Sequence, residues 1–118
     1  MDHVQIGREG ENLAEAFLIE RGYKILERNY RLSFGEIDVI AREAQTLCFI
    51  EVKTRDADYY GHPFEAVTPA KQRTIRKVAQ MYLTEHPDDE SAFIRFDVVG
   101  IMNDEQGVPV IELLQDAF

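Results

Sequence analysis

Apolar residues recur at helical spacing in the first part of the chain. In residues 7–21, Leu13 and Phe17 stand four positions apart and so fall on one face of a helix. Gly22 follows the pattern and is typical of the residue just after a helix. The spacing predicts a first helix over residues 7–21.

A second helical pattern follows residue 68. Thr68 suits the N-cap position, and Pro69 suits the first helical position, where a missing N–H is no loss. The apolar residues that follow trace one face: Ile75, Val78, Ala79, Tyr82 and Leu83. The dipeptide at residues 86–87, His-Pro, ends the pattern. We therefore predict a second amphipathic helix that starts at Pro69.

Segments rich in β-branched and aromatic residues predict the strands: 23–31, 35–41, 46–55, 93–102 and 108–114. Turns are expected at residues 33–35, at 42–45, where the second and third strands would form an antiparallel hairpin, and at 103–107. The order is helix, three strands, helix, two strands. Because the second helix can carry the chain between parallel strands, we expect an α/β fold with a mixed five-stranded sheet flanked by helices.

Residues 56–67 show no periodicity. A long segment without a period is typical of a mobile surface loop, and we expect one here. Tyr59 and Tyr60 within it could stack on bases or pack as a lid.

Charged residues alternate with apolar ones in the strand at residues 35–41. Side chains of a strand point to opposite faces in turn, so Glu36 and Asp38 would share one face. Ile37 and Val39 would share the other. This strand therefore has a charged side and an apolar side.

The next strand shows the same alternation. Its charged side would carry Glu51, Lys53 and Arg55, opposite Ile50 and Val52. Because the two strands are neighbours, the charged sides would lie next to each other.

Carboxylates on neighbouring strands indicate a metal site. If helices cover both faces, Glu36, Asp38 and Glu51 need cations or an open cleft, because burying an unpaired carboxylate costs several kcal/mol. Two carboxylates can converge on Mg²⁺ or Mn²⁺, which prefer oxygen ligands, and the Val52 carbonyl is a natural additional ligand. Lys53 could then orient or deprotonate a metal-bound water and balance charge on a phosphate. The same residues also fit a solvated sheet face, or a cross-strand ion pair between Asp38 and Lys53.

Length and composition limit the possible classes. A chain of 118 residues with 45% hydrophobic content suits one domain over residues 1–118. No run approaches the roughly 20 apolar residues of a membrane span, and the first residues lack a secretory pattern, so we expect a cytoplasmic protein. Cys48 is the single cysteine and lies in an apolar stretch, which excludes an internal disulfide and indicates core packing.

The formal net charge of −9 argues against a nucleic-acid partner, because phosphate binding depends on Lys and Arg. The charge is uneven, however. Residues 1–83 hold 12 Lys and Arg against 13 Asp and Glu, a net of −1, whereas residues 84–118 hold Arg95 against nine acids, a net of −8. A substrate could meet the near-neutral part, where bound divalent cations would add positive charge. The acidic C-terminal third could instead dock a protein partner.

The start of the second predicted helix is basic, with Lys71, Arg73, Arg76 and Lys77. Such a run could follow a phosphate backbone. Solvated surface positions are an equal explanation for Arg73 and Lys77. Lys71 stands one turn before Ile75 and is therefore better placed to face a cleft.

Several short motifs occur in a fixed order along almost the whole chain: Gly10-Glu11, Gly22-Tyr23, Gly35-Glu36-Ile37-Asp38, Glu51-Val52-Lys53-Thr54-Arg55, Lys71 and Arg95-Phe96-Asp97-Val98. Together they resemble the YraN family of largely uncharacterised bacterial proteins. An acidic residue in a first helix, then Asp, then Glu-x-Lys on the next strand, then a basic helix, resembles the PD-(D/E)xK nuclease superfamily. Ile37 departs from that pattern, since it stands where the superfamily's name has proline.

The resemblance implies a restriction-endonuclease-like αβββαβ core and a relation to Holliday-junction resolvases. By that analogy Asp38 and Glu51 bind metal, Lys53 serves the attacking water, and Glu11 approaches the same site from the first helix. The resolvases of this superfamily work as symmetric dimers, so the resemblance also implies a homodimer.

We therefore expect a Mg²⁺- or Mn²⁺-dependent endonuclease that acts on DNA, with branched or otherwise structured DNA as candidate substrates. Arg55, Lys71 and Arg76 are the residues expected to contact nucleic acid. The alternative is a non-catalytic nucleic-acid-binding or adaptor domain that keeps the nuclease fold. An enzyme requires metal-dependent cleavage, and an adaptor shows none.

Overall fold

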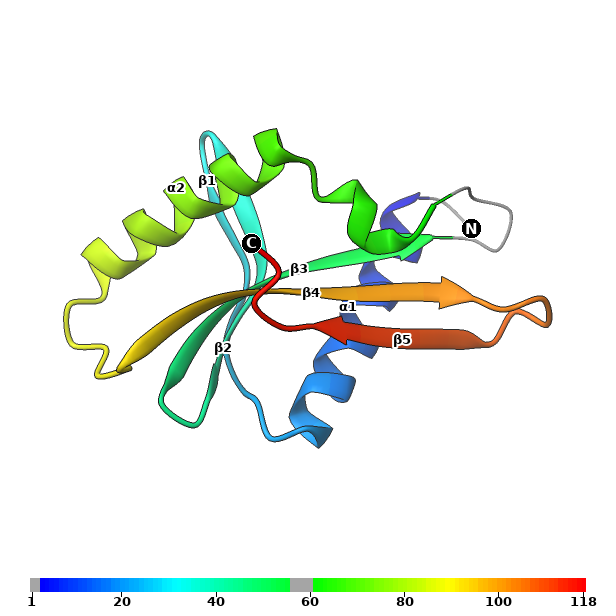
Figure 1. Ribbon diagram of the computed structural model, residues 1–118, viewed down its shortest axis with the longest axis horizontal. Helices are drawn as coiled ribbons and strands as arrows, with labels where there is room; N and C mark the ends of the chain where they lie inside the picture. Colours follow the sequence, from blue (N-terminus) through cyan, green and yellow to red (C-terminus); the bar gives the residue numbers. More distant parts are fainter. Residues whose placement is uncertain (1–2, 56–60) are drawn as a thin grey trace.

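The computed structural model describes residues 3–55 and 61–118, with side chains from residue 9 onwards (Figure 1). Its elements are, in chain order, α1 (His3–Glu20), β1 (Lys24–Leu32), β2 (Gly35–Glu43), β3 (Thr46–Arg55), the 3-10 helix η1 (Pro63–Ala66), α2 (Pro69–Glu85), β4 (Phe93–Asn103) and β5 (Pro109–Leu114). The two predicted helices and the five predicted strands are confirmed. No helix in the described part of the chain is long and apolar enough to cross a membrane.

The strands form one mixed sheet in the order β1-β2-β3-β4-β5. The β1–β2, β2–β3 and β4–β5 pairs are antiparallel, and the β3–β4 pair is parallel. Parallel neighbours need a connection that crosses over a face of the sheet, and η1 and α2 lie in that connection. The predicted mixed five-stranded sheet is therefore confirmed.

The two helices cover opposite faces of the sheet (Figure 1). On the α1 side, a buried core joins the helix to the central strands through Ala14, Leu18, Val39, Cys48, Ile50 and Val99. On the α2 side, a second core contains Ile40, Leu47, Phe49, Ile75, Val78, Tyr82 and Phe96. Because a helix packs on each face, a charged side chain on a central strand is solvated only where neither helix covers it.

The predicted mobile loop is wrong for part of its length, since residues 63–66 form η1. His62 caps this helix, because its ring Nδ1 accepts a hydrogen bond from the Phe64 N–H at 3.2 Å. One helical turn is too short to leave a period in the sequence. Tyr59 and Tyr60 lie outside the described residues.

Gly100 on β4 lets η1 lie close against the sheet. A Cβ atom at this position would stand 3.0 Å from both the Phe64 ring and the Pro63 side chain. Gly100 is paired with Lys53 on the neighbouring strand β3. The absence of a side chain at residue 100 therefore places η1 beside the end of β3 that carries the charged residues.

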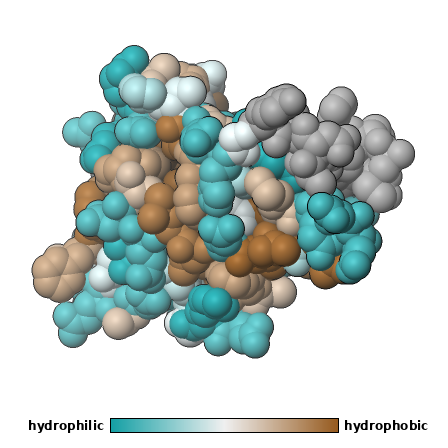
Figure 2. Space-filling view, turned by 45° about the vertical axis from the view of Figure 1, so that its right-hand side comes forward, coloured by the Kyte–Doolittle hydropathy of each residue, from teal (hydrophilic) through white to brown (hydrophobic). Residues whose placement is uncertain are grey.

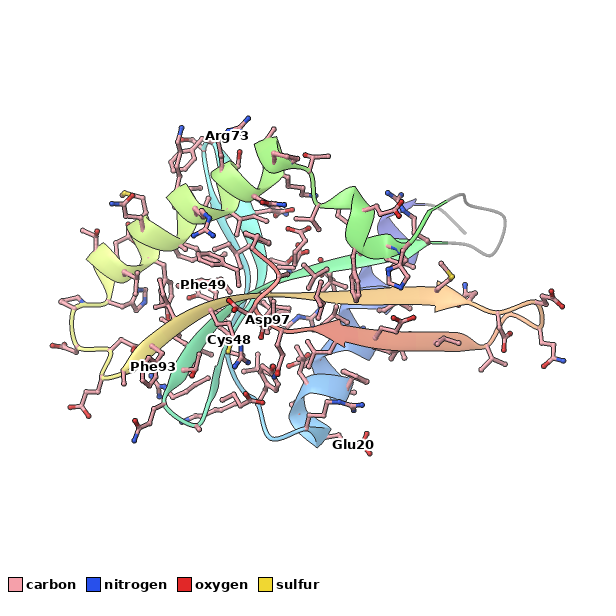
Figure 3. The ribbon with its side chains drawn as sticks, viewed as in Figure 1. Glu20, Cys48, Phe49, Arg73, Phe93 and Asp97 are labelled. Carbon is pink, nitrogen blue, oxygen red and sulfur yellow. The ribbon has the colours of Figure 1, made fainter. Side chains whose placement is uncertain are left out.

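A buried polar network ties the C-terminal segment to the α1 side of the sheet. The Arg95 guanidinium donates to both carboxylate oxygens of Asp97, at 2.8 and 3.0 Å, and Asp97 is fully buried. Asp97 also accepts hydrogen bonds from the Tyr23 hydroxyl and the Asp116 N–H. Figure 3 shows Asp97 and Cys48 in the middle of the molecule. Arg95 and Asp97 therefore have a structural role, because they hold this network together.

The strand β5 is one edge of the sheet and carries part of the acidic C-terminal third. Val110 and Leu114 are exposed on it, by 47% and 39%. Figure 2, which brings the β4–β5 hairpin forward, shows hydrophobic side chains gathered in the middle of that face with hydrophilic ones around them. The acidic third therefore includes surface that is apolar as well as charged.

Candidate functional site

Asp38 and Glu51 lie at a fork between two central strands. The β2–β3 ladder runs from the pair Glu43 and Thr46 to the pair Val39 and Ile50 and ends there. Asp38 is the residue just beyond Val39 on β2, and Glu51 is the residue just beyond Ile50 on β3. Strand pairing therefore brings the two carboxylates together, because each is the first residue after the last ladder pair.

The alternation of side chains reverses at this fork. Ile37 packs in the α2-side core and Val39 in the α1-side core, although the two are only two residues apart. The prediction that they share one face is therefore wrong. On the neighbouring strand β1, Asn29 has a φ of 53°, a left-handed conformation that Asn tolerates better than most residues. The irregular positions Asn29 and Asp38 lie between the same two strand pairs of the β1–β2 ladder.

The Asp38 carboxyl is almost completely buried. Its exposed fraction is 7%, and its Oδ2 accepts a hydrogen bond from the Val52 N–H at 2.8 Å. Burial, together with electrostatic repulsion from Glu51, raises the pKa of Asp38 to about 8. Without a compensating cation, Asp38 therefore keeps a proton well above the pH at which an ordinary aspartate loses it.

Glu51 is as deeply buried as Asp38, with 6% exposure, but has two ammonium groups next to it. The Lys71 Nζ lies 3.3 Å and the Lys53 Nζ lies 3.8 Å from the same oxygen, Oε1. Lys53 follows Glu51 on β3, and Lys71 comes from the first turns of α2. Thr68 fixes the start of that helix, because its hydroxyl accepts a hydrogen bond from the Lys71 N–H at 3.3 Å.

The two lysines respond differently to their shared surroundings. Burial, and then the hydrogen bond and repulsion from Lys71, lower the pKa of Lys53. Burial also acts to lower the pKa of Lys71, but the hydrogen bond with Lys53 and the attraction of Glu51 outweigh it and raise that pKa. Lys71 is therefore the better charged partner of Glu51, and Lys53 is the one that gives up its proton more easily.

The lysines form the outer layer of this cluster. The Lys71 and Lys53 side chains are 38% and 23% exposed, whereas both carboxylates are buried below them. The described surface also has a hollow of about 590 Å³ beside Tyr23, Glu43 and Gln115. It is not lined by Lys53, Lys71 or the two carboxylates. A ligand would therefore reach the carboxylates past the lysine side chains.

The donor set fits Mg²⁺ or Mn²⁺. The described residues contain no group of three or more His, Cys, Asp or Glu side chains that could hold a metal. Mg²⁺, however, is usually held by only one or two carboxylates and fills its other positions with water and substrate oxygens. The Val52 carbonyl points to the same edge of β3 as the Val52 N–H, toward Asp38, and Val52 lies beyond the last β2–β3 ladder pair. Two buried carboxylates and one carbonyl suit a hard cation that keeps several waters.

Glu11 has contacts on β1 and is not joined to this cluster by its described contacts. Its carboxylate lies 3.5 Å from the Arg28 guanidinium. The Asn29 amide, oriented to satisfy its hydrogen bonds, donates to both Glu11 oxygens at 3.2 and 3.3 Å. The structure therefore places Glu11 next to the strand that neighbours Asp38, with its charge already paired.

The residues expected to contact nucleic acid have separate surroundings. Arg55 is the last residue of β3, two residues beyond Lys53. The Arg76 guanidinium lies over the Phe96 ring, 4.6 Å from its centroid, and also faces Phe118. Lys71, expected to face a substrate, contacts Glu51 directly. Sequence reasoning missed this contact, although the one-turn offset of Lys71 from Ile75 already indicated that it faces inward.

Glu36 is not part of the buried cluster. Its carboxylate pairs with Arg31 at 2.9 Å, and both side chains are exposed. The structure thus separates the four acids and bases that meet at the fork, namely Asp38, Glu51, Lys53 and Lys71, from the surface pair next to them.

Residues 10–101 match the model of a protein family described as "Uncharacterised protein family UPF0102". Similar chains include a UPF0102 protein of Chlorobium phaeobacteroides (strain BS1), 55% identical over 82% of this chain and 76% of its own length. Another, from Caldicellulosiruptor bescii, is 47% identical over the full length of both chains. A third, from Syntrophus aciditrophicus, is 49% identical over 98% of this chain and 90% of its own. The names of these relatives state no activity.

Proposed function

The chain belongs to the uncharacterised protein family UPF0102, which confirms the family resemblance seen in its motifs, and we propose that it is a metal-dependent phosphodiesterase acting on DNA. The observation that carries this proposal is the pair of buried carboxylates, Asp38 and Glu51, with two lysines at the fork between β2 and β3. We also propose that the chain is related to the PD-(D/E)xK nuclease superfamily. The element order from α1 to β4, helix, three strands, helix and strand, supports it.

A structural role alone does not explain why two acids are buried together. Two carboxylates in a covered sheet repel each other, and Lys53 and Lys71 both approach Glu51, so Asp38 has no ammonium partner among the described ion pairs. Burying such a group costs free energy unless a cation arrives. A site that is costly without a ligand is typical of a binding or catalytic centre.

In the proposed reaction, Asp38, Glu51 and the Val52 carbonyl hold one divalent ion. When bound, this ion supplies positive charge that stabilises the extra negative charge on phosphate in the transition state. Lys53 lies 3.8 Å from Glu51, and its lowered pKa makes its neutral form, which can take a proton from the attacking water, easier to reach. Lys71 remains charged and can hold a phosphate oxygen once it moves away from Glu51.

The helix α2 supports a polyanionic substrate. Its residues from Pro69 to Thr84 include Lys71, Arg73, Arg76 and Lys77 and no acid, although the whole chain has a net charge of −9. Arg73 and Lys77 are exposed. A basic helix beside the carboxylate pair can follow a phosphate backbone toward the site.

The test is cleavage of linear, flapped and four-way DNA by the purified protein with Mg²⁺, Mn²⁺ or EDTA. Lys53→Met should lower the rate by about 100-fold or more while leaving DNA binding intact. Lys24→Met is the matched control, because Lys24 is exposed and starts β1 at the far end of the β1–β2 ladder from Asp38. It should cleave like the parent chain.

The same experiment addresses the alternative. A chain that binds DNA but cleaves none of the substrates with any metal would be an adaptor domain. Equal cleavage by the Lys53→Met variant would show that the measured activity does not come from this site.

A further inference from the structure

One exposed aromatic side chain lies in the turn that leads into the strand carrying Asp38, outside both hydrophobic cores. Phe34 is 51% exposed and belongs to neither of the two hydrophobic cores of the described residues. It stands in the turn between β1, which ends at Leu32, and β2, which starts at Gly35, and these two residues pair with each other. Two-residue hairpin turns favour Asn, Gly and Asp, so turn geometry does not explain a Phe.

The tip of this hairpin is fixed against the basic helix. Gly35 packs so closely on α2 that a Cβ atom there would overlap the Thr74 methyl group and would lie 3.2 Å from Val78. Arg73 and Lys77 immediately precede these two contact residues on the helix, and both are exposed. Figure 3 shows Arg73 at the end of α2 where the β1–β2 turn comes alongside. Phe34 is therefore exposed at a hairpin tip that packs against the helix carrying these cationic side chains.

Phe34 lies within a few nucleotides' length of the candidate site. Asp38 follows Phe34 by four positions, which is about 13 Å at about 3.3 Å per residue. A stacked strand advances about 3.4 Å per nucleotide and an unstacked one advances more, so Phe34 would meet the DNA within about four nucleotides of a phosphate bound at Asp38. A strand that runs along this side of the hairpin would pass the site, the basic side chains and the ring.

We propose that Phe34 is a stacking platform for an unpaired or terminal base, so that this protein selects DNA whose bases are unstacked near the cleaved bond. This inference rests on the proposed phosphodiesterase function and specifies its substrate. An aromatic ring can stack only on a base face that is free, as at a flap, a gap, a branch point or a strand end. In a continuous duplex both faces of every internal base are already stacked, and the ring finds no partner.

The chain contains no tryptophan, so a single Trp reports directly on this position. Phe34→Trp in a Lys53→Met background is titrated with gapped or flapped DNA and with a closed circular duplex of the same sequence, which has no strand ends. Its fluorescence should be strongly quenched by the gapped and flapped DNA and hardly changed by the duplex. Phe93→Trp is the matched control, because Phe93 is 65% exposed and pairs with Thr46, at the end of the β2–β3 ladder away from Asp38 and Glu51. Figure 3 shows Phe93 at the lower left, away from Arg73 at the top.

Binding of labelled DNA gives a second, independent measurement. Phe34→Ala should weaken binding of the gapped and flapped DNA by about 10-fold and leave duplex binding unchanged, and Phe34→Tyr should restore it. If Phe34→Trp binds gapped DNA without quenching, or responds equally to the duplex, the stacking inference is overturned and the phosphodiesterase proposal stands. If the protein binds none of these DNAs, both proposals are overturned.

Discussion

Replacement of Asp38 by Asn should change how the stability of the metal-free protein depends on pH. The asparagine side chain has nearly the same shape as aspartate, and its oxygen can still accept the hydrogen bond from the Val52 N–H. It lacks the negative charge that burial and Glu51 make unfavourable. The substitution therefore removes the charge with little change in packing.

The sign of the effect follows from the raised pKa of Asp38. The folded protein holds this proton up to about pH 8, whereas the unfolded chain releases it near the ordinary value of 3.8. Stability from this group is therefore fully present below about pH 4 and is lost as the pH rises through about 8. At about 1.4 kcal/mol for each tenfold change in proton affinity, the ceiling is about 6 kcal/mol. Because Lys53 and Lys71 lie close to the carboxylate pair and relieve part of the cost, we expect about 2–3 kcal/mol.

The assay is urea unfolding of both proteins in EDTA at about pH 5 and about pH 9. The gain in free energy of unfolding from Asp38→Asn should be small at the lower pH, because most of the loss in the parent chain falls between that pH and about 8, and it should be largest at the higher pH. Adding Mn²⁺ should stabilise only the parent chain, because only it has both carboxylates. If the free energies of unfolding of the two proteins in EDTA changed with pH in parallel, the conclusion that burial makes the charged form of Asp38 unfavourable would be refuted.

Three further substitutions test separate parts of the structure. Lys71→Met should tighten Mn²⁺ binding about 2- to 5-fold, measured by calorimetry, because its ammonium no longer competes for Glu51; weaker binding would contradict this. Arg95→Met should lower the free energy of unfolding by about 3–5 kcal/mol, because it leaves Asp97 buried without its ion-pair partner, and Mn²⁺ affinity should not change. Thr68→Ala should cost about 1 kcal/mol in the same urea assay through loss of the α2 N-cap, and an unchanged midpoint would argue against that cap.

The sequence was sufficient to predict the two α-helices and the five strands because their signals are local. Alternating and helical patterns set the strands and helices, and Thr68-Pro69 marked the start of α2, as the structure confirms. The approach of Asp38 to Glu51 also follows from local signals, since a short hairpin turn fixes which residues of β2 and β3 face each other.

Other features depend on contacts between distant segments. Ile37 and Val39 point to opposite faces of the sheet, and this irregularity lies opposite the left-handed Asn29 on the neighbouring strand. Strict alternation along one strand cannot predict it. The pairing of Glu11 with Arg28 depends on how α1 lies across β1. The contact of Lys71 with Glu51 depends on where the crossover places α2. Each of these is set by tertiary packing, which no single stretch of sequence encodes.

Direct measurement of Mn²⁺ binding, by the electron paramagnetic resonance signal of the free ion, tests the central claim that the fork holds a divalent cation. The parent chain should bind one ion, and Asp38→Asn and Glu51→Gln should each weaken that binding by at least about 10-fold. Lys24→Met should bind like the parent chain. Unchanged Mn²⁺ affinity in both carboxylate variants, or no binding by the parent chain, would contradict the account.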